Sequence, residues 1–334
     1  MTSVYSRAST RHLLLVAVFA FGPCFHDSFA TPSVTVVARP AGGQIREDKV
    51  YSPTLRQDIH LNVYLPAEYD NNGARRYPVI YLLHGRGDSM QAWVKIKADL
   101  DAMIAADEIP EVIAIMPDAP FSRRASYYID SQFAGDSVSH LPRGEAVETA
   151  FTTDLINAVD HAYLTAPDRS LRIIAGYSMG GYGAMHLALA HPDLFAAAIV
   201  LSPAVYHPLP PLSSSTREFG AFGKGNDVFD DTIYRENNYP ALLARFPAAG
   251  LPLTVFVAVG DDEIPTTDPR EASHDLDLEA HVLYNQLRRV PMITTEFRVI
   301  NGGHNWNTWR PTFAEGARFV FRSVRHAEPN QPAR

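Results

Sequence analysis

Short, continuous apolar runs recur along the chain. Because both faces of such a run are apolar, each predicts a strand buried on both sides, as in a parallel sheet. The runs lie at 77–83, 112–116, 171–175, 196–201 and 253–259. Residues 57–66 alternate instead between apolar and polar positions, which predicts a strand with one exposed face, and a further strand is expected at 295–300.

Between these strands, apolar residues recur at helical spacing. The predicted helices lie at 89–106, 144–163, 276–289 and 312–325, with another that starts directly after residue 180. Such alternation predicts an α/β fold in which a mostly parallel sheet carries helices on both faces. Two stretches, 119–142 and 204–250, are irregular and aromatic, and the second is too long for a simple connection.

The first 30 residues have the pattern of a secretory signal peptide. Arg7 and Arg11 give a positive start, and the apolar core at 13–21 is too short to span a bilayer. Ser28 and Ala30 supply the small residues that precede a cleavage site. We therefore expect a bacterial protein that is exported to the periplasm or secreted, with no membrane span after cleavage.

Composition narrows the choice of partner and chemistry. The net charge of −8 argues against a nucleic acid or an anionic membrane, because phosphate binding needs a basic face. The one cysteine, Cys24, lies in the signal segment, so a cysteine nucleophile and cysteine metal sites are excluded from the mature chain. No His, Asp and Glu set has the spacing of metal ligands, and we expect neither a metal nor a cofactor.

The strand at 171–175 runs directly into the motif G-Y-S-M-G at 176–180, and a helix follows. A strand, a tight turn with Ser at its tip and a helix form the context in which this motif presents a nucleophile. The turn is so sharp that Ser178 needs small residues two positions before and after it, and Gly176 and Gly180 supply them. The turn also aims the Met179 N–H at the reaction centre, at a helix N-terminus that favours negative charge.

An acid and a histidine follow two later strands. Ligands of open α/β sheets bind at the carboxyl ends of the strands, where Asp262 and Glu263 follow 253–259 and His304 follows 295–300. The order Ser, acid, His is that of the α/β-hydrolase triad. His304 would take the proton of Ser178 and return it to the leaving group, and the acid would orient His304. Residue type favours Asp262 and loop register favours Glu263, so both stay candidates, with Asp261 behind them.

A developing oxyanion needs two N–H donors about 3 Å away. Met179 supplies one, and the loop after the strand at 77–83 supplies the other, from Arg86 or, as second choice, Gly85. We also expect Gly85 to contact substrate, because glycine lets the backbone approach closely.

These motifs resemble the "putative esterase" group of α/β-hydrolases, which holds S-formylglutathione hydrolases, feruloyl and acetylxylan esterases, enterochelin esterases and mycolyltransferases of the antigen 85 type. The resemblance implies an α/β-hydrolase fold, an oxyanion N–H at Arg86 and a substrate-binding Trp at Trp306. The chain departs from the group's pattern at Glu263, where Asp is more usual, and in the two irregular stretches. The matching segments are 77–93, 113–118, 174–204, 255–263 and 302–313.

We therefore expect a serine carboxylesterase that hydrolyses a carboxylic ester or thioester, on a small molecule or linked to a polysaccharide, through an acyl-enzyme. One alternative is acyl transfer to a sugar or lipid hydroxyl of the cell envelope, which would use the same residues. The other is a non-catalytic binding protein on a hydrolase scaffold, against which the intact Ser178 and His304 argue. The oligomeric state stays open.

The expected organisation has four parts. A signal peptide at 1–30 and a leader at 31–50 precede one α/β-hydrolase catalytic domain at 51–326, in which 204–250 is inserted over the active site, and residues 327–334 form a disordered tail.

Overall fold

The computed structural model describes residues 42–327 with three short gaps, at 71–72, 120 and 265–267. The predicted signal peptide and most of the predicted leader and tail lie outside the described residues. Within the part of the chain that is described, no helix is both long enough and apolar enough to cross a bilayer.

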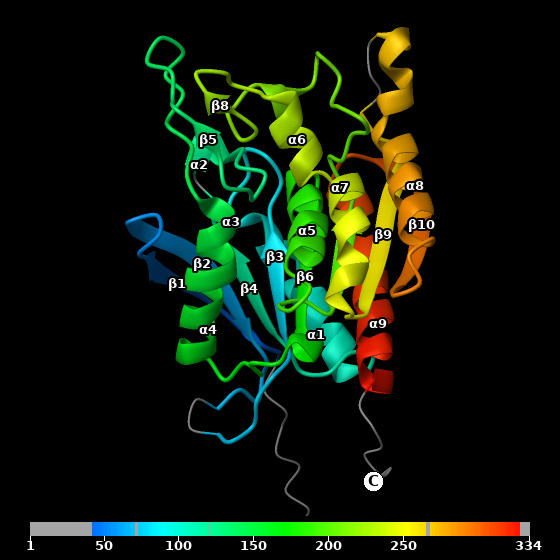
Figure 1. The fold of residues 1–334 in the computed structure, drawn as a ribbon. Coiled ribbons are helices and arrows are strands. Elements are labelled where there is room, and N and C mark those ends of the chain that lie inside the picture. The colour runs from blue at the N-terminus through cyan, green and yellow to red at the C-terminus, as the bar shows by residue number, and fades with distance from the viewer. Residues whose placement is uncertain (1–41, 71–72, 120, 265–267, 328–334) are drawn as a thin grey trace, which may run out of the picture. The chain divides into compact units, whose positions relative to one another are not determined.

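A sheet of 8 strands forms the centre of the domain (Figure 1). Its strands are β1 (Gln44–Ser52), β2 (Gln57–Leu65), β3 (Val79–Leu83), β4 (Ile113–Pro117), β6 (Arg172–Tyr177), β7 (Ala197–Leu201), β9 (Leu253–Asp262) and β10 (Ile293–Gly303). They lie side by side in the order β1-β2-β4-β3-β6-β7-β9-β10. From β4 to β10 all neighbours are parallel, whereas β1 and β2 add an antiparallel edge.

The apolar runs are confirmed as strands that are buried on both faces. Every residue of β3, β4, β6 and β7 is buried. In β6, Ile174 belongs to the core on one side of the sheet, and Ile173 and Ala175 belong to the core on the other side. Successive side chains of a strand point to opposite faces, so a sheet covered on both sides needs apolar residues at every position.

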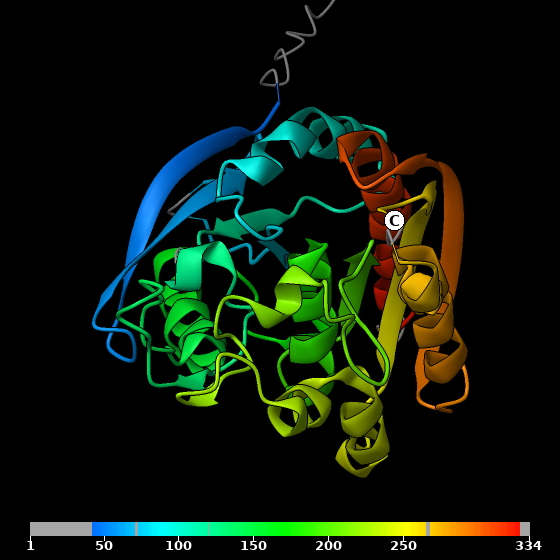
Figure 2. The same cartoon turned by 90° about the horizontal axis from the view of Figure 1, so that it is seen from above.

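Helices cover both faces of the sheet, as the alternation of strands and helices predicts. The residues of α1 and α9 pack in one core, and those of α4, α5 and α8 in the other, an arrangement that the view from above makes plain (Figure 2). The helices are α1 (Lys97–Ala105), α2 (Phe121–Arg124), α3 (Val147–Thr149), α4 (Ile156–Ala162), α5 (Met179–Ala190), α6 (Asp231–Asn237), α7 (Tyr239–Arg245), α8 (Leu276–Leu287) and α9 (Trp306–Ala327).

Three of the predicted helices differ from those in the structure. The helix expected at 312–325 begins at Trp306, although Pro311 favours a start at its own position. Pro311 lies inside α9 because the preceding turn is already closed, with the Asn305 carbonyl accepting from the Trp309 N–H.

The other two differences are changes of helix type. The helix expected at 144–163 consists of α3, a π-helical turn at Ala150–Leu155 and α4. The helix expected at 89–106 opens with a 3₁₀ turn at Ala92–Ile96 before α1. Hydrophobic spacing does not distinguish these turns from an α-helix, because all three bury a similar face.

The two irregular stretches lie against each other. Strands β5 (Gln132–Phe133) and β8 (Lys224–Gly225) pair in parallel, at the top of the view in Figure 1. The Ala134 N–H continues this ladder with a hydrogen bond of 2.7 Å to the Gly225 carbonyl. Between them, the two stretches place several aromatic and hydroxyl side chains next to Ser178, as described below.

Candidate active site

Ser178 lies at the sharp turn between β6 and α5. Its backbone has φ 56° and ψ −122°, a strained conformation that the Ser178 N–H supports with a hydrogen bond of 2.9 Å to the Leu201 carbonyl. A Cβ on Gly176 would lie 2.0 Å from the Gly180 carbonyl oxygen, and one on Gly180 would lie 2.2 Å from the Leu83 carbonyl oxygen. The glycines of the motif are therefore required by contact with backbone atoms that have no room to move.

Ser178, His304 and Glu263 form one hydrogen-bonded row. His304 Nε2 lies 2.9 Å from Ser178 Oγ, and His304 Nδ1 lies 2.6 Å from Glu263 Oε2. A carboxylate only accepts, so Nδ1 carries the proton and Nε2 is free to accept from the Ser178 hydroxyl. The side chain of Glu263 is 1% exposed and that of His304 is 14% exposed, so the row leads from the interior to the surface of a pocket.

The neighbouring acids point elsewhere. Asp262 is exposed at the end of β9 and makes no hydrogen bond to His304. Asp261 accepts from the Gly302 N–H at 3.0 Å. Of the three adjacent carboxylates, the structure thus brings only Glu263 to the histidine.

Further donors hold the Glu263 carboxylate in place. Glu263 Oε1 accepts from the Ser202 hydroxyl at 2.6 Å and from the Gly260 N–H at 2.9 Å. Burial alone would raise the pKa of Glu263, but the hydrogen bonds from His304, Ser202 and Gly260 outweigh it and lower the pKa below its usual value. The acid is therefore ionised, as the orientation of a histidine requires.

Sequence reasoning missed two members of this network. The Trp309 indole N–H donates to Ser202 Oγ at 2.9 Å, and the Trp309 ring stands edge-on to the His304 ring with centroids 5.0 Å apart. Ser202 follows β7 directly and has a left-handed backbone, with φ 39°. Reading the residue after every strand would have singled out Ser202, but its hydroxyl gave no signal of a bond to a residue 107 positions away.

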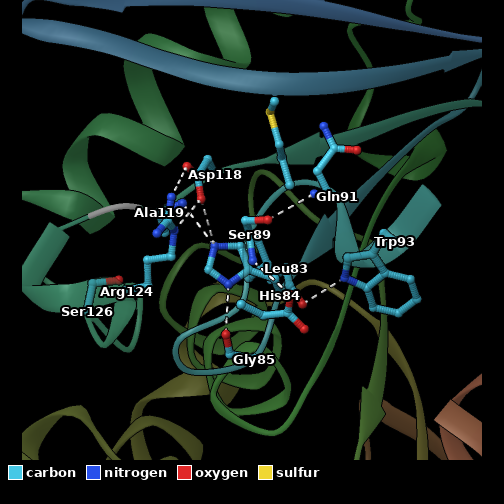
Figure 3. Close-up of polar contacts among 12 residues, drawn as sticks. Leu83, His84, Gly85, Ser89, Gln91, Trp93, Asp118, Ala119, Arg124 and Ser126 are labelled. Atoms are coloured by element: carbon cyan, nitrogen blue, oxygen red, sulfur yellow. Dashed lines mark hydrogen bonds and ion pairs between the residues drawn. The ribbon is translucent and has the colours of Figure 1, made fainter. Parts of the chain in front are cut away.

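A second network fixes the loop after β3 (Figure 3). The buried His84 accepts from the Ala119 N–H at Nε2, 3.0 Å away, so its proton is on Nδ1, which donates to the Gly85 carbonyl at 2.8 Å. The Asp88 N–H donates to the same carbonyl at 3.1 Å. In a trans peptide the N–H points away from the preceding carbonyl, so this arrangement turns the Arg86 N–H away from His84.

The rest of the loop is held from its flanks. The Trp93 indole N–H donates to the Leu83 carbonyl at 3.0 Å (Figure 3). The Tyr128 hydroxyl donates to the His84 carbonyl, also at 3.0 Å. Among the described residues, no acceptor takes the N–H of Arg86 or of Met179. Both predicted oxyanion donors are therefore free to bind a ligand.

A cavity of about 220 Å³ opens beside Ser178. Of the predicted residues, Gly85, Arg86, Ser178 and His304 line it. The prediction that Trp306 binds substrate is not supported, because Trp306 does not line the cavity. Its ring packs against Trp93 and Tyr177 and lies under the Lys95 ammonium. Trp309 lines the cavity instead. The remaining wall comes mainly from the two irregular stretches, with Tyr127, Ala204, Tyr206, Ser215 and Thr216.

No cluster that could hold a metal is found among the described His, Cys, Asp and Glu residues. A larger cavity, of about 630 Å³, lies between the start of β1 and α1 and contains none of the residues of the hydrogen-bonded row.

Comparison with known proteins gives a consistent result. A family model described as "Putative esterase" matches residues 52–320. The chain is 31% identical over 172 residues to an endo-1,4-beta-xylanase/feruloyl esterase of Xylanibacter ruminicola, covering 50% of this chain and 22% of that protein. It is 32% identical over 140 residues to an esterase of Mycobacterium tuberculosis, covering 41% of this chain and 27% of that one. The chain therefore spans about a quarter of the length of these curated relatives.

Solved structures share the fold over most of the chain. A ferulic acid esterase superposes with a TM-score of 0.64 at 25% identity, covering 84% of this chain and 98% of that one. An S-formylglutathione hydrolase from Agrobacterium tumefaciens gives a TM-score of 0.64 at 17% identity, covering 85% and 96%. These likenesses confirm the α/β-hydrolase fold that the resemblance to the esterase group implies.

Proposed function

The chain belongs to the putative esterase family, and from that membership we propose that it is a serine carboxylesterase with Ser178 as nucleophile. The family and the likeness to a ferulic acid esterase support a carboxylic ester hydrolase. The observation that carries the assignment of residues is the row in which His304 bridges Ser178 and Glu263. A nucleophile, a base and an orienting acid in hydrogen-bond contact are the arrangement that activates a serine hydroxyl.

In the first half of the reaction, Ser178 Oγ attacks the ester carbonyl carbon and its proton passes to His304 Nε2. The carbonyl oxygen becomes an oxyanion, which the Met179 and Arg86 N–H groups bind. The tetrahedral intermediate then collapses, His304 gives the proton to the departing alkoxide, and an acyl group remains on Ser178. Hydrolysis of this acyl-enzyme repeats the sequence with water as the attacking group.

Glu263 is the acid of this proposal, rather than Asp262. Its carboxylate is buried, ionised and 2.6 Å from His304 Nδ1, so it holds the imidazole in the tautomer that accepts from Ser178. It also stabilises the imidazolium that forms during attack. Its second oxygen, bound by Ser202 and Gly260, cannot swing away from this position without losing two hydrogen bonds.

Covalent labelling tests the nucleophile. A fluorophosphonate reacts with a serine hydroxyl that a neighbouring base activates, so we expect the native protein to be labelled once, at Ser178, as located by mass spectrometry of the peptides. Ser178→Ala and heat-unfolded protein are the controls and should stay unlabelled. A native, folded protein that is not labelled at Ser178 would contradict the mechanism and would favour a binding protein on this scaffold.

Transfer to a hydroxyl uses the same acyl-enzyme, and a competition assay distinguishes it from hydrolysis. With p-nitrophenyl acetate as donor, a hydrolase releases acetate at a rate that glycerol or glucose scarcely changes. An acyltransferase would form the acetylated alcohol at the expense of acetate. We propose hydrolysis.

We also propose that the protein is exported after cleavage behind Ala30. The charged start, short apolar core and small residues before the cleavage site support this assignment. N-terminal sequencing of the protein recovered from a bacterial periplasm or medium should begin at Thr31, whereas a mature chain that keeps residues 1–30 would refute export by cleavage.

A further inference from the structure

One residue with a guanidinium, Arg86, lines the pocket beside Ser178, and it is exposed. Within the described residues, this group forms no ion pair and no hydrogen bond. Two arginines nearby differ in this respect. Arg124 pairs with Asp118, and Arg217 pairs with Asp231 and donates to the Pro210 carbonyl. Among the described residues, no carboxylate pairs with the positive charge of Arg86, so an anion in the pocket would not have to displace one.

An aromatic ring sets the position of this charge. The Arg86 guanidinium lies over the Phe219 ring, 5.6 Å from its centroid, which favours a cation. Burial raises the pKa of the Tyr127 and Tyr206 hydroxyls, and the Arg86 charge acts against that rise in both. Arg86 is therefore close enough to influence both tyrosines of the pocket wall.

Residues with hydroxyl groups line the same pocket. Tyr127 and Thr216 share a hydrogen bond of 2.8 Å, and Tyr206 and Ser215 line the cavity with them. These hydroxyls come from the two irregular stretches and can donate to a bound oxygen atom. A guanidinium with several hydroxyl donors beside it is suited to a group that only accepts hydrogen bonds.

The acids near the pocket do not neutralise Arg86. Asp88 lines the cavity, but its Oδ2 accepts from the Tyr177 hydroxyl at 2.7 Å and its Oδ1 accepts from the Ser89 N–H at 3.0 Å. Glu218 is exposed, and its charge raises the pKa of the Tyr127 hydroxyl, whereas the charge of Arg86 lowers it. Neither carboxylate comes within ion-pair distance of the guanidinium, so a negatively charged substrate would supply the missing partner.

We propose that Arg86 binds a carboxylate of the substrate, so that the enzyme acts preferentially on esters that carry an ionised carboxylate in addition to the ester group. This inference rests on the proposed function, because it concerns the same pocket. A guanidinium presents parallel N–H groups that match a carboxylate, and Arg86 lines the same cavity as Ser178, so one substrate molecule can contact both. Arg86 thus serves twice, with its backbone N–H at the oxyanion and its side chain at the substrate.

Two pairs of esters that differ only in charge test the proposal. Methyl hydrogen terephthalate and methyl 4-carbamoylbenzoate place a carboxylate or a neutral amide on the acyl side. The compounds 4-acetoxybenzoate and 4-acetoxybenzamide do the same on the leaving side. The measured quantity is the ratio of kcat/KM for the anionic ester to kcat/KM for its neutral partner. Comparing this ratio between wild type and variant cancels the intrinsic reactivity of each ester.

The Arg86→Gln variant keeps the backbone N–H and loses the charge. In at least one of the two pairs, we expect the ratio of kcat/KM values for Arg86→Gln to be about tenfold lower than the wild-type ratio. A tenfold change is what the loss of one charge-assisted hydrogen bond in a partly open site would cause. The Arg86→Lys variant should restore part of the ratio, because the charge returns without the planar fork. The Arg217→Gln variant is the matched control: Arg217 also lies over a phenylalanine but is outside the pocket, and its ratio should equal that of the wild type.

Two results would overturn the inference, and they are distinguishable. Ratios in Arg86→Gln that match the wild type in both pairs, with the esters still hydrolysed, would remove the carboxylate and leave the esterase intact. Failure of the wild type to hydrolyse any of the four esters, together with no fluorophosphonate labelling of Ser178, would remove the proposed function and the inference with it.

Discussion

Replacing Glu263 by Gln removes the charge beside His304 while keeping the shape of the side chain. In the native site, Glu263 Oε2 accepts from His304 Nδ1 at 2.6 Å, which leaves Nε2 able to accept from Ser178. A Gln amide can donate to Nδ1 instead, and the imidazole proton then moves to Nε2, where it faces the hydroxyl it should deprotonate. The variant also loses the charge that stabilises the imidazolium.

The expected loss follows from both effects. Exchange of a buried triad carboxylate for an amide lowers kcat about 10⁴-fold, which corresponds to roughly 5.5 kcal/mol of transition-state stabilisation. The Asp262→Asn variant is the matched control, since it makes the same chemical change one residue away. Asp262 is exposed and makes no hydrogen bond to His304, so the kcat of the Asp262→Asn variant should stay within about threefold of the wild-type value.

Steady-state hydrolysis of p-nitrophenyl acetate gives kcat and KM for both variants. Thermal unfolding shows whether each is folded, because a folded protein is needed for the comparison. KM should change little, since Glu263 does not line the pocket. A folded Glu263→Gln protein that keeps more than about a tenth of the wild-type kcat, or an Asp262→Asn protein that loses as much as Glu263→Gln, would refute the assignment of the acid.

The remaining predictions concern the groups that support the row. Ser202→Ala removes a donor to Glu263 and leaves the buried Trp309 N–H without its acceptor, so it should lower the free energy of unfolding by about 1–3 kcal/mol, measured in urea, and lower kcat. A urea midpoint equal to that of the wild type would contradict this bond. His84→Gln should lower kcat by up to about 100-fold with KM nearly unchanged, because the Arg86 N–H loses its fixed direction; a KM effect alone would speak against it. The pKa of Glu263 is lowered by folding, so its contribution to stability is full above the ordinary value of 4.5 and is lost as the pH falls through the lowered value. The stability difference between wild type and Glu263→Gln should therefore shrink as the pH falls below 4.5, and a difference that stays constant in urea titrations would contradict the shift.

The sequence was sufficient to predict the sheet and the turn at Ser178, because both depend on local pattern. Strands buried on both faces need apolar residues at every position, and the sharp turn needs glycine on both sides. The position of His304 was also predictable, since residues that follow parallel strands gather at one edge of the sheet.

The sequence did not show which of two nearby residues reaches the site, for the acid or for the tryptophan. That choice depends on where a strand or helix begins or ends, which sets the direction of each side chain and which hydrophobic spacing does not specify. Asp262 is the last residue of β9 and stays exposed, whereas Glu263, directly after the strand, is buried. Trp306 and Trp309 lie three residues apart on α9, and only Trp309 faces His304. The start of α9, six residues before the predicted one, decides which of the two indoles reaches the pocket.

The short ladder between β5 and β8 has a consequence for protein engineering. The two stretches that it joins, on either side of Ser178 in the chain, both supply residues to the pocket wall, and both lie outside the central sheet. Main-chain bonds and the contact between Tyr127 and Thr216 fasten one to the other. Transplanting either stretch alone into a related hydrolase would leave half of this ladder without its complement. A graft intended to carry over substrate choice should therefore move both stretches as one unit and leave the recipient's own Ser-His-acid scaffold in place.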